Sequence, residues 1–78
     1  MMKKRFVEVK AIFHEDGSIT PTHIIWDDTR EFEIEEILDI RKAASLKVGG
    51  QGLRYTVRIL DKKKYLFYEE PKWFVEGK

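Results

Sequence analysis

The sequence predicts a small all-β domain, and three observations lead to this fold class. Apolar and polar residues alternate with a period of two along most of the chain, which is typical of strands that bury one face. Clusters of Gly, Asp, Glu and Lys separate these stretches and indicate tight turns. The 78 residues leave room for one domain only. We therefore expect residues 1–78 to form a six-stranded antiparallel meander, curled into a partly open SH3-like barrel or a strongly bent sheet.

The first two expected strands form a hairpin. Residues 3–13 place four apolar side chains on one face: Val7, Val9, Ala11 and Phe13. Residues 15–18 follow as a turn, in which Gly17 can adopt positive φ. The second strand, residues 18–26, contains Pro21, which has no N–H to donate to a ladder. This strand should therefore lie at an edge or be bulged at the proline.

After a turn at residues 27–29, residues 30–46 fit two interpretations. As a strand, this segment puts one set of apolar side chains on a single face: Phe32, Ile34, Leu38 and Ile40. As a helix, it stacks another set at i, i+3 and i+4 spacing: Ile34, Ile37, Leu38, Arg41 and Ala44. We favour one long strand, because the alternation is cleaner and a short turn leads directly into it.

Three further strands complete the expected sheet. A glycine-rich loop at residues 49–52 leads into residues 53–60, where Leu53, Tyr55, Val57 and Ile59 share one face. A charged turn at residues 61–64, a strand at 65–68, a turn at 69–71 and a strand at 73–75 follow. The residues expected in the core are Val57, Ile59, Phe67 and Trp73.

Several classes of function find no support in the sequence. The chain has no cysteine, so thiol chemistry and cysteine–zinc sites are excluded. His14 and His23 match no metal-ligand spacing, and the glycine-rich loop lacks the lysine and helix of a phosphate-binding loop. No segment resembles a signal peptide or a membrane span. We expect a non-enzymatic, cytoplasmic protein that uses no cofactor or metal and contacts no membrane.

The distribution of charge is the feature that points to a binding function. Residues 27–39 carry a local charge of −6 and residues 41–64 one of +7, although the whole chain has a net charge of only +1. The basic segment, with tyrosines close by, predicts weak, sequence-independent contact with single-stranded nucleic acid. The candidate residues are Arg41, Arg54, Arg58, Lys62, Lys63 and Lys64.

Other interpretations of the same charges stay open. The acidic and basic segments could pair across the sheet, which would neutralise both. The basic face could instead dock on an acidic protein surface. The domain could also bind a protein, or a second copy of itself, through a sheet edge or an aromatic patch.

A resemblance to known proteins rests on a Trp26-Asp27-turn-Arg30 hairpin, an Ile37-Leu38-Asp39 strand, an alternating Arg-Tyr strand at residues 54–58 and an aromatic strand at 73–75. Over residues 20–76 this pattern resembles a group of short bacterial proteins of unassigned function. It is also loosely similar to the small C-terminal β domain of Y-family DNA-polymerase-like repair proteins. Where that domain often has glycine in the hairpin turn, this chain has Asp28-Thr29. The resemblance implies a β module associated with DNA transactions and assigns no site residue.

Overall fold

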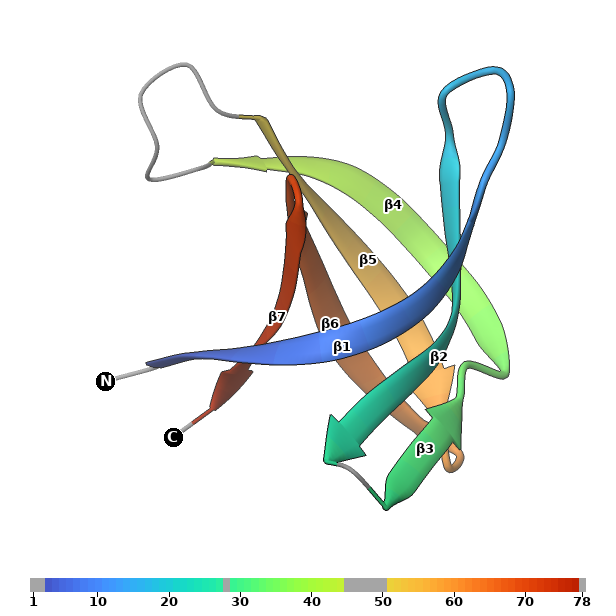
Figure 1. The fold of residues 1–78 in the computed structure, drawn as a ribbon, viewed down its shortest axis with the longest axis vertical. Coiled ribbons are helices and arrows are strands. Elements are labelled where there is room, and N and C mark those ends of the chain that lie inside the picture. The colour runs from blue at the N-terminus through green and yellow to red at the C-terminus, as the bar shows by residue number, and fades with distance from the viewer. Residues whose placement is uncertain (1–2, 28, 45–50, 78) are drawn as a thin grey trace.

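A computed structural model describes residues 3–27, 29–44 and 51–77, and these residues form seven antiparallel strands in one strongly curled sheet (Figure 1). The strands are β1 (Lys3–Phe13), β2 (Ile19–Asp27), β3 (Arg30–Glu33), β4 (Glu36–Ala44), β5 (Gln51–Ile59), β6 (Lys62–Glu69) and β7 (Lys72–Gly77). Their order in the sheet is β3-β2-β1-β7-β6-β5-β4. The expected all-β fold, a partly open barrel or strongly bent sheet of antiparallel strands, is confirmed, with seven strands in place of the expected six. Among the described residues no helix is long and apolar enough to cross a membrane.

The expected long strand at residues 30–46 is wrong in one respect, because it is broken into β3 and β4. β3 pairs with β2, whereas β4 pairs with β5 at the opposite edge of the sheet. Between them, the Ile34 N–H donates to the Thr22 carbonyl and the Glu35 N–H donates to the Arg58 carbonyl, each at 2.9 Å. The chain therefore crosses from one edge to the other and brings the two ends of the curled sheet together. The helical alternative is excluded for residues 30–44.

The break also changes which side chains point inward. Phe32 and Ile34 pack against the core as expected, but beyond the break Ile37 takes the inner position. An irregularity in the β4–β5 register between Ile37 and Asp39 then shifts the pattern again. Leu38 and Ile40, which the alternation places with Phe32 and Ile34, are instead 43% and 51% exposed.

β1 serves two partners along its length. Its first part, from Lys3 to Val7, pairs with β7, and its second part pairs with β2. The β1–β2 register shifts next to Pro21, which is opposite Ala11 and leaves Thr22 as the extra residue. The expected bulge at the proline is confirmed, and β2 lies inside the sheet between β1 and β3.

The core lies on the concave inner face of the sheet. Tyr55, Val57 and Leu66 have almost no exposed surface and pack with the rest of the cluster, which comprises Ile24, Ile59 and Trp73. The Tyr55 hydroxyl donates to the Ile19 carbonyl at 2.8 Å, so its polar end is satisfied inside the barrel. Burial raises the pKa of this phenol above its usual value of 10.0.

Two of the expected turns differ from the structure. The β5–β6 turn consists of Leu60 and Asp61, both with positive φ (51° and 63°), and the three lysines expected in a turn form the start of β6. Of the expected glycine-rich loop, residues 49–50 lie outside the described residues, and Gln51 and Gly52 already belong to β5. The first turn matches expectation, since Gly17 has φ 93°.

Candidate functional site

The six candidate basic residues lie on two faces of the sheet. Residues directly opposite each other on antiparallel strands project from the same face. Lys62 is opposite Ile59 and Lys64 is opposite Val57, so these two lysines share the inner face of the core residues. The other four candidates project from the convex outer face: Arg41, Arg54, Arg58 and Lys63. The expectation of a single basic face is therefore corrected.

Two of the outer arginines are engaged by carboxylates. An Arg58 Nη donates to Glu36 Oε1, and the Arg58 Nε lies 4.0 Å from Glu35 Oε1. The Arg41 Nε donates to Asp39 Oδ2 at 2.7 Å. We call these five residues the ion-paired strip. The charges of Arg41 and Arg58 are therefore neutralised by ion pairs between the acidic and the basic segment.

Arg54 is in a different environment. Its guanidinium carbon lies 5.0 Å from the centre of the Tyr65 ring, and the Lys63 ammonium lies 5.9 Å from the same ring. Across the strands, Arg54 is opposite Arg41 on β4 and Phe67 on β6. Its Nε is buried without a hydrogen-bond acceptor. Within the described part of the chain, no ion pair involves Arg54 or the lysines of β6.

Three phenylalanines continue the row that Arg54 begins. The register sets Phe67, Phe74 and Phe6 opposite one another on β6, β7 and β1. The Phe67 and Phe74 rings stack with centroids 5.0 Å apart and planes 4° apart, and Phe6 meets Phe74 edge-on at 5.9 Å. Phe74 is buried beneath its neighbours, whereas Phe6 is 55% exposed.

Two more lysines lie beside this row of rings. Lys4 Nζ is 4.8 Å from the centre of the Phe74 ring, and Lys72 Nζ is 5.2 Å from that of Phe6. Lys4 also approaches Glu69, with the nearest nitrogen and oxygen 3.5 Å apart. We define the aromatic–cation surface as the following residues of the outer face: Lys4, Phe6, Arg54, Lys63, Tyr65, Phe67, Lys72 and Phe74.

Sequence reasoning found only part of this surface. Phe67 was expected in the core but is half-buried on the outer face, because its neighbours Leu66 and Tyr68 take the inner positions. Several aromatic residues lie close to the basic segment in the sequence. Tyr55 and Trp73 belong to the core, whereas the Tyr65 ring lies against the guanidinium of Arg54. One usable signal was present: Phe74 lies between Trp73 and Val75, and Phe6 directly precedes Val7, and all three of these neighbours pack in or against the core.

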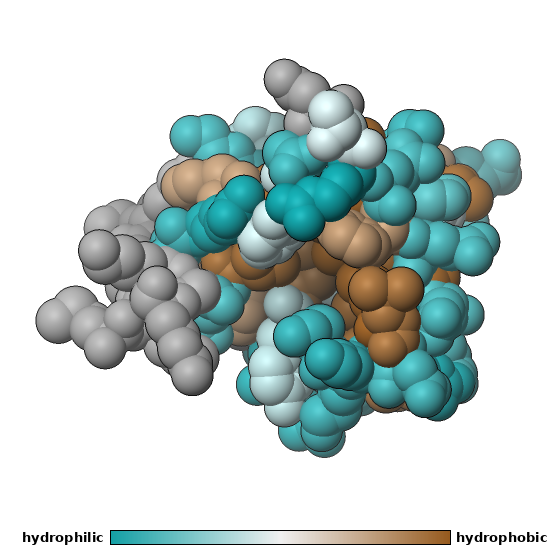
Figure 2. Space-filling model, turned by 90° about the horizontal axis from the view of Figure 1, so that it is seen from below, coloured by the Kyte–Doolittle hydropathy of each residue, from teal (hydrophilic) through white to brown (hydrophobic). Residues whose placement is uncertain are grey.

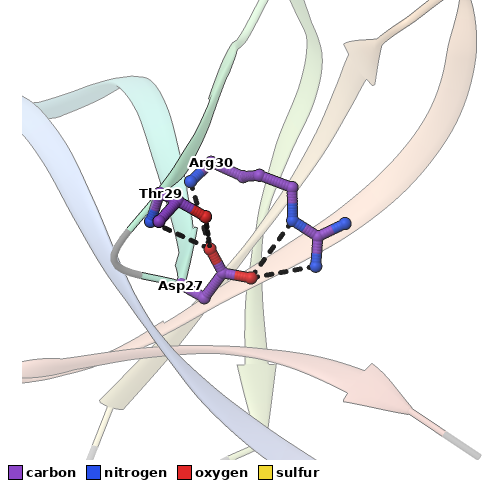
Figure 3. A network of polar contacts seen from close by, with 3 residues as sticks. All are labelled: Asp27, Thr29 and Arg30. Carbon is purple, nitrogen blue, oxygen red and sulfur yellow. Dashed lines mark hydrogen bonds and ion pairs between the residues drawn. The ribbon is translucent and has the colours of Figure 1, made fainter.

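A separate polar network holds the turn between β2 and β3 (Figure 3). Asp27 Oδ1 accepts hydrogen bonds from the N–H and hydroxyl of Thr29, and Asp27 Oδ2 accepts two from the Arg30 guanidinium. The Thr29 N–H, the Arg30 guanidinium and the Thr29 hydroxyl together lower the pKa of Asp27 from 3.8 to about 2. This carboxylate stabilises the turn, and it neutralises the charge of Arg30, whose side chain is 59% exposed.

The two histidines take part in local hydrogen bonds. His14 Nε2 lies 2.7 Å from the Thr20 hydroxyl, and His23 Nδ1 lies 2.9 Å from that of Thr22. Among the residues that the structure describes, no three His, Asp or Glu side chains are grouped as they would be to hold a metal ion.

The fold and its outer surface place this chain in the broad class of small curled β-sheet domains. Comparison with family models, with curated proteins and with solved structures gives no match.

Proposed function

We propose that this chain is a non-catalytic module that contacts single-stranded nucleic acid, without sequence preference, through the aromatic–cation surface. Bases stack on aromatic side chains regardless of their identity, and Lys and Arg attract the phosphates. The observation that carries the proposal is the register that aligns Phe6, Phe74 and Phe67 with Arg54 across four neighbouring strands. In this row the exposed Phe6 ring offers a stacking surface, and the cations beside the row supply positive charge on the same face.

The positions of the lysines suit a strand that crosses the rings. Lys4 comes two residues before Phe6, and Lys72 comes two residues before Phe74. Because β1 and β7 are antiparallel, these lysines lie on opposite sides of the row of rings. Residues two apart along a strand are separated by about 6.6–6.8 Å. A base on the exposed Phe6 would therefore have a cation within reach on either side.

The test is fluorescence anisotropy with a labelled single-stranded oligothymidine at about 20 mM and about 200 mM salt, because phosphate contacts weaken as salt rises. A single strand should give a log–log slope of about −0.7 for each phosphate that is neutralised. Three to five contacts therefore predict a slope of roughly −2 to −3.5. Undetectable binding at the lower salt concentration would contradict the proposal.

A second candidate function, protein interaction through a sheet edge, is favoured by a specific feature of β4. In the described part of the chain, β4 pairs with β5 on one side and with no strand on the other. Leu38 and Ile40 lie on this strand with about half of their surface exposed. An edge of this kind can accept a strand from a partner or from a second copy of the chain.

Sedimentation velocity over a range of protein concentrations tests this candidate. Self-pairing predicts a dimer that Ile40→Lys dissociates, since a charge on an edge strand opposes strand addition. If the wild-type chain and the variant are both monomers at all concentrations, self-pairing is excluded, and a different protein remains as the partner for this edge.

A further inference from the structure

The open end of the barrel contains a pocket of about 500 Å³. It lies among the β2–β3 turn, the β5–β6 turn and the end of β7, and Figure 2 shows hydrophobic side chains within a hollow that hydrophilic ones surround. Its volume is within the range of about 300–1,000 Å³ that is usual for small-molecule sites. We call it the mouth pocket. Its apolar lining is Ile24, Trp26, Phe32, Ile59, Leu60, Tyr65 and Val75.

The rim of the mouth pocket is positively charged. The charged residues that line it are four cations and one acid: Arg30, Lys62, Lys63, Lys64 and Glu76. Asp27 already neutralises Arg30 (Figure 3). Lys62 and Lys64 point to the inner side of the sheet and form no ion pair within the described part of the chain. These two lysines therefore place uncompensated charge beside the apolar lining.

An exposed leucine at the edge of the mouth pocket adds a second observation. Leu60 is 66% exposed and has φ 51°, in the left-handed region that bulky residues rarely adopt. Two-residue hairpin turns in which both central residues have positive φ normally use Asn-Gly or Asp-Gly. Strained backbone of this kind clusters at functional sites, including ligand clamps. The turn thus places an apolar side chain at the pocket edge at a cost in backbone energy.

The lining determines what kind of ligand fits. Apart from the Trp26 indole N–H and the Tyr65 hydroxyl, the seven apolar lining residues carry no polar side-chain atom. A nucleobase would bury donors and acceptors on its edges that these side chains leave unmatched, at a cost in binding. An aliphatic body carries no such groups, and a carboxylate at its end matches the lysines on the rim.

We propose that the mouth pocket binds an anionic amphiphile, an alkyl carboxylate of medium length. Its chain packs against Phe32, Ile59 and Val75, and its carboxylate meets the ammonium groups of Lys62 and Lys64. This site lies at the end of the barrel and shares Lys63 and Tyr65 with the aromatic–cation surface. Lys62, Lys64 and Leu60 belong to the mouth pocket alone, so variants of these three residues test this proposal separately from the first.

The experiment is a titration of the ¹⁵N-labelled chain with decanoate, followed by amide chemical shifts, with uncharged decanol as the matched ligand. Saturable shifts should centre on the lining residues, and decanoate should bind more tightly than decanol. The double variant Lys62→Ser and Lys64→Ser should lower the affinity for decanoate by about 2- to 30-fold, from the usual value of exposed charge pairs, and leave decanol unchanged. Lys72→Ser on the outer face is the control and should change neither.

A second variant tests the apolar part of the site without endangering the fold. Leu60→Asn suits positive φ better than leucine does, so the turn should be retained. It should weaken decanoate and decanol alike, because it removes apolar contact from the pocket edge. Shifts that do not saturate, or equal losses for both ligands in the double lysine variant, would overturn the proposal. Shifts of the lining residues that depend on protein concentration alone would overturn it in favour of a second copy of the chain.

Discussion

The outer face of the sheet has two regions in which arginine and lysine side chains have different neighbours. Over β4 and β5, the guanidinium groups of Arg41 and Arg58 lie against carboxylates. Over β6, β7 and β1, the charged groups of Arg54, Lys63 and Lys72 lie over aromatic rings instead. Carboxylates therefore neutralise the cations of the first region, whereas Arg54, Lys63 and Lys72 of the second form no ion pair within the described residues.

The difference shows that the neighbour of a cation matters more for binding than the number of cations. A carboxylate cancels the charge that a phosphate would meet, and the pair must be separated before the cation can be used. An aromatic ring attracts the cation through its quadrupole and adds no opposite charge. The ring also provides a surface on which a base can stack.

The largest expected effect comes from removing an exposed ring. Phe6→Ala should lower the affinity for single-stranded oligothymidine by about 5- to 150-fold, since base stacking contributes about 1–3 kcal/mol per base. Ile40→Ala is the matched control, because Ile40 is 51% exposed and Phe6 is 55% exposed. The measurement is the affinity of both variants for the oligothymidine, obtained from anisotropy titrations. Equal affinities would favour docking on an acidic protein surface, which needs the cations and not the rings.

Removing one cation from each region should have unequal effects on salt dependence. Lys63→Ser should reduce the steepness of the log–log salt plot by about 0.7, the value for one phosphate contact. Arg41→Ser should leave the steepness almost unchanged, because the Arg41 guanidinium is already hydrogen-bonded to Asp39. The measurement is anisotropy at several salt concentrations. Equal changes in the two variants would remove the distinction between the regions.

The ion-paired strip should become a binding surface if its acids are neutralised. The double variant Glu35→Gln and Glu36→Gln removes the charges that face Arg58 and keeps the glutamine oxygen at position 35 that can accept the Asp61 N–H. We expect a slope steeper by about 0.7 and a modest gain in affinity, since one more cation can meet a phosphate. A loss of affinity, with the fold intact by circular dichroism, would show that these acids do more than neutralise Arg58.

The smallest effect concerns the ion pair of the β2–β3 turn. The pKa of Asp27 is lowered to about 2 in the folded chain, against 3.8 for the ordinary carboxyl. Its ionised form therefore stabilises the fold above pH 3.8, and this contribution is lost as the pH falls through about 2. A carboxyl ¹³C titration should give this low value, and Thr29→Ala should move it upward. A pKa of 3.8 in the native chain would mean that the turn network is not formed in solution.

The all-β class, most of the strands and the core residues of β5 could be predicted from the sequence, because their alternation is regular. The break between Ile34 and Glu35 could not, since it depends on hydrogen bonds to Thr22 and Arg58 from distant strands. The six basic residues could be identified, but their partners could not. Whether Arg58 meets a glutamate and Arg54 a tyrosine depends on cross-strand register, which is set by the whole sheet.

The pairing of β1 with β7 has a consequence for how the domain is assembled. Lys3 is opposite Gly77, so almost the whole described chain lies between these two neighbouring residues. Such long-range pairings slow folding, because the entropy of closing the intervening loop is lost before the contact forms. During synthesis, β1 can form its hairpin with β2 early, whereas the part of β1 that contains Phe6 cannot pair until β7 has been synthesised. We therefore expect the row of phenylalanines to be among the last features of the domain to form.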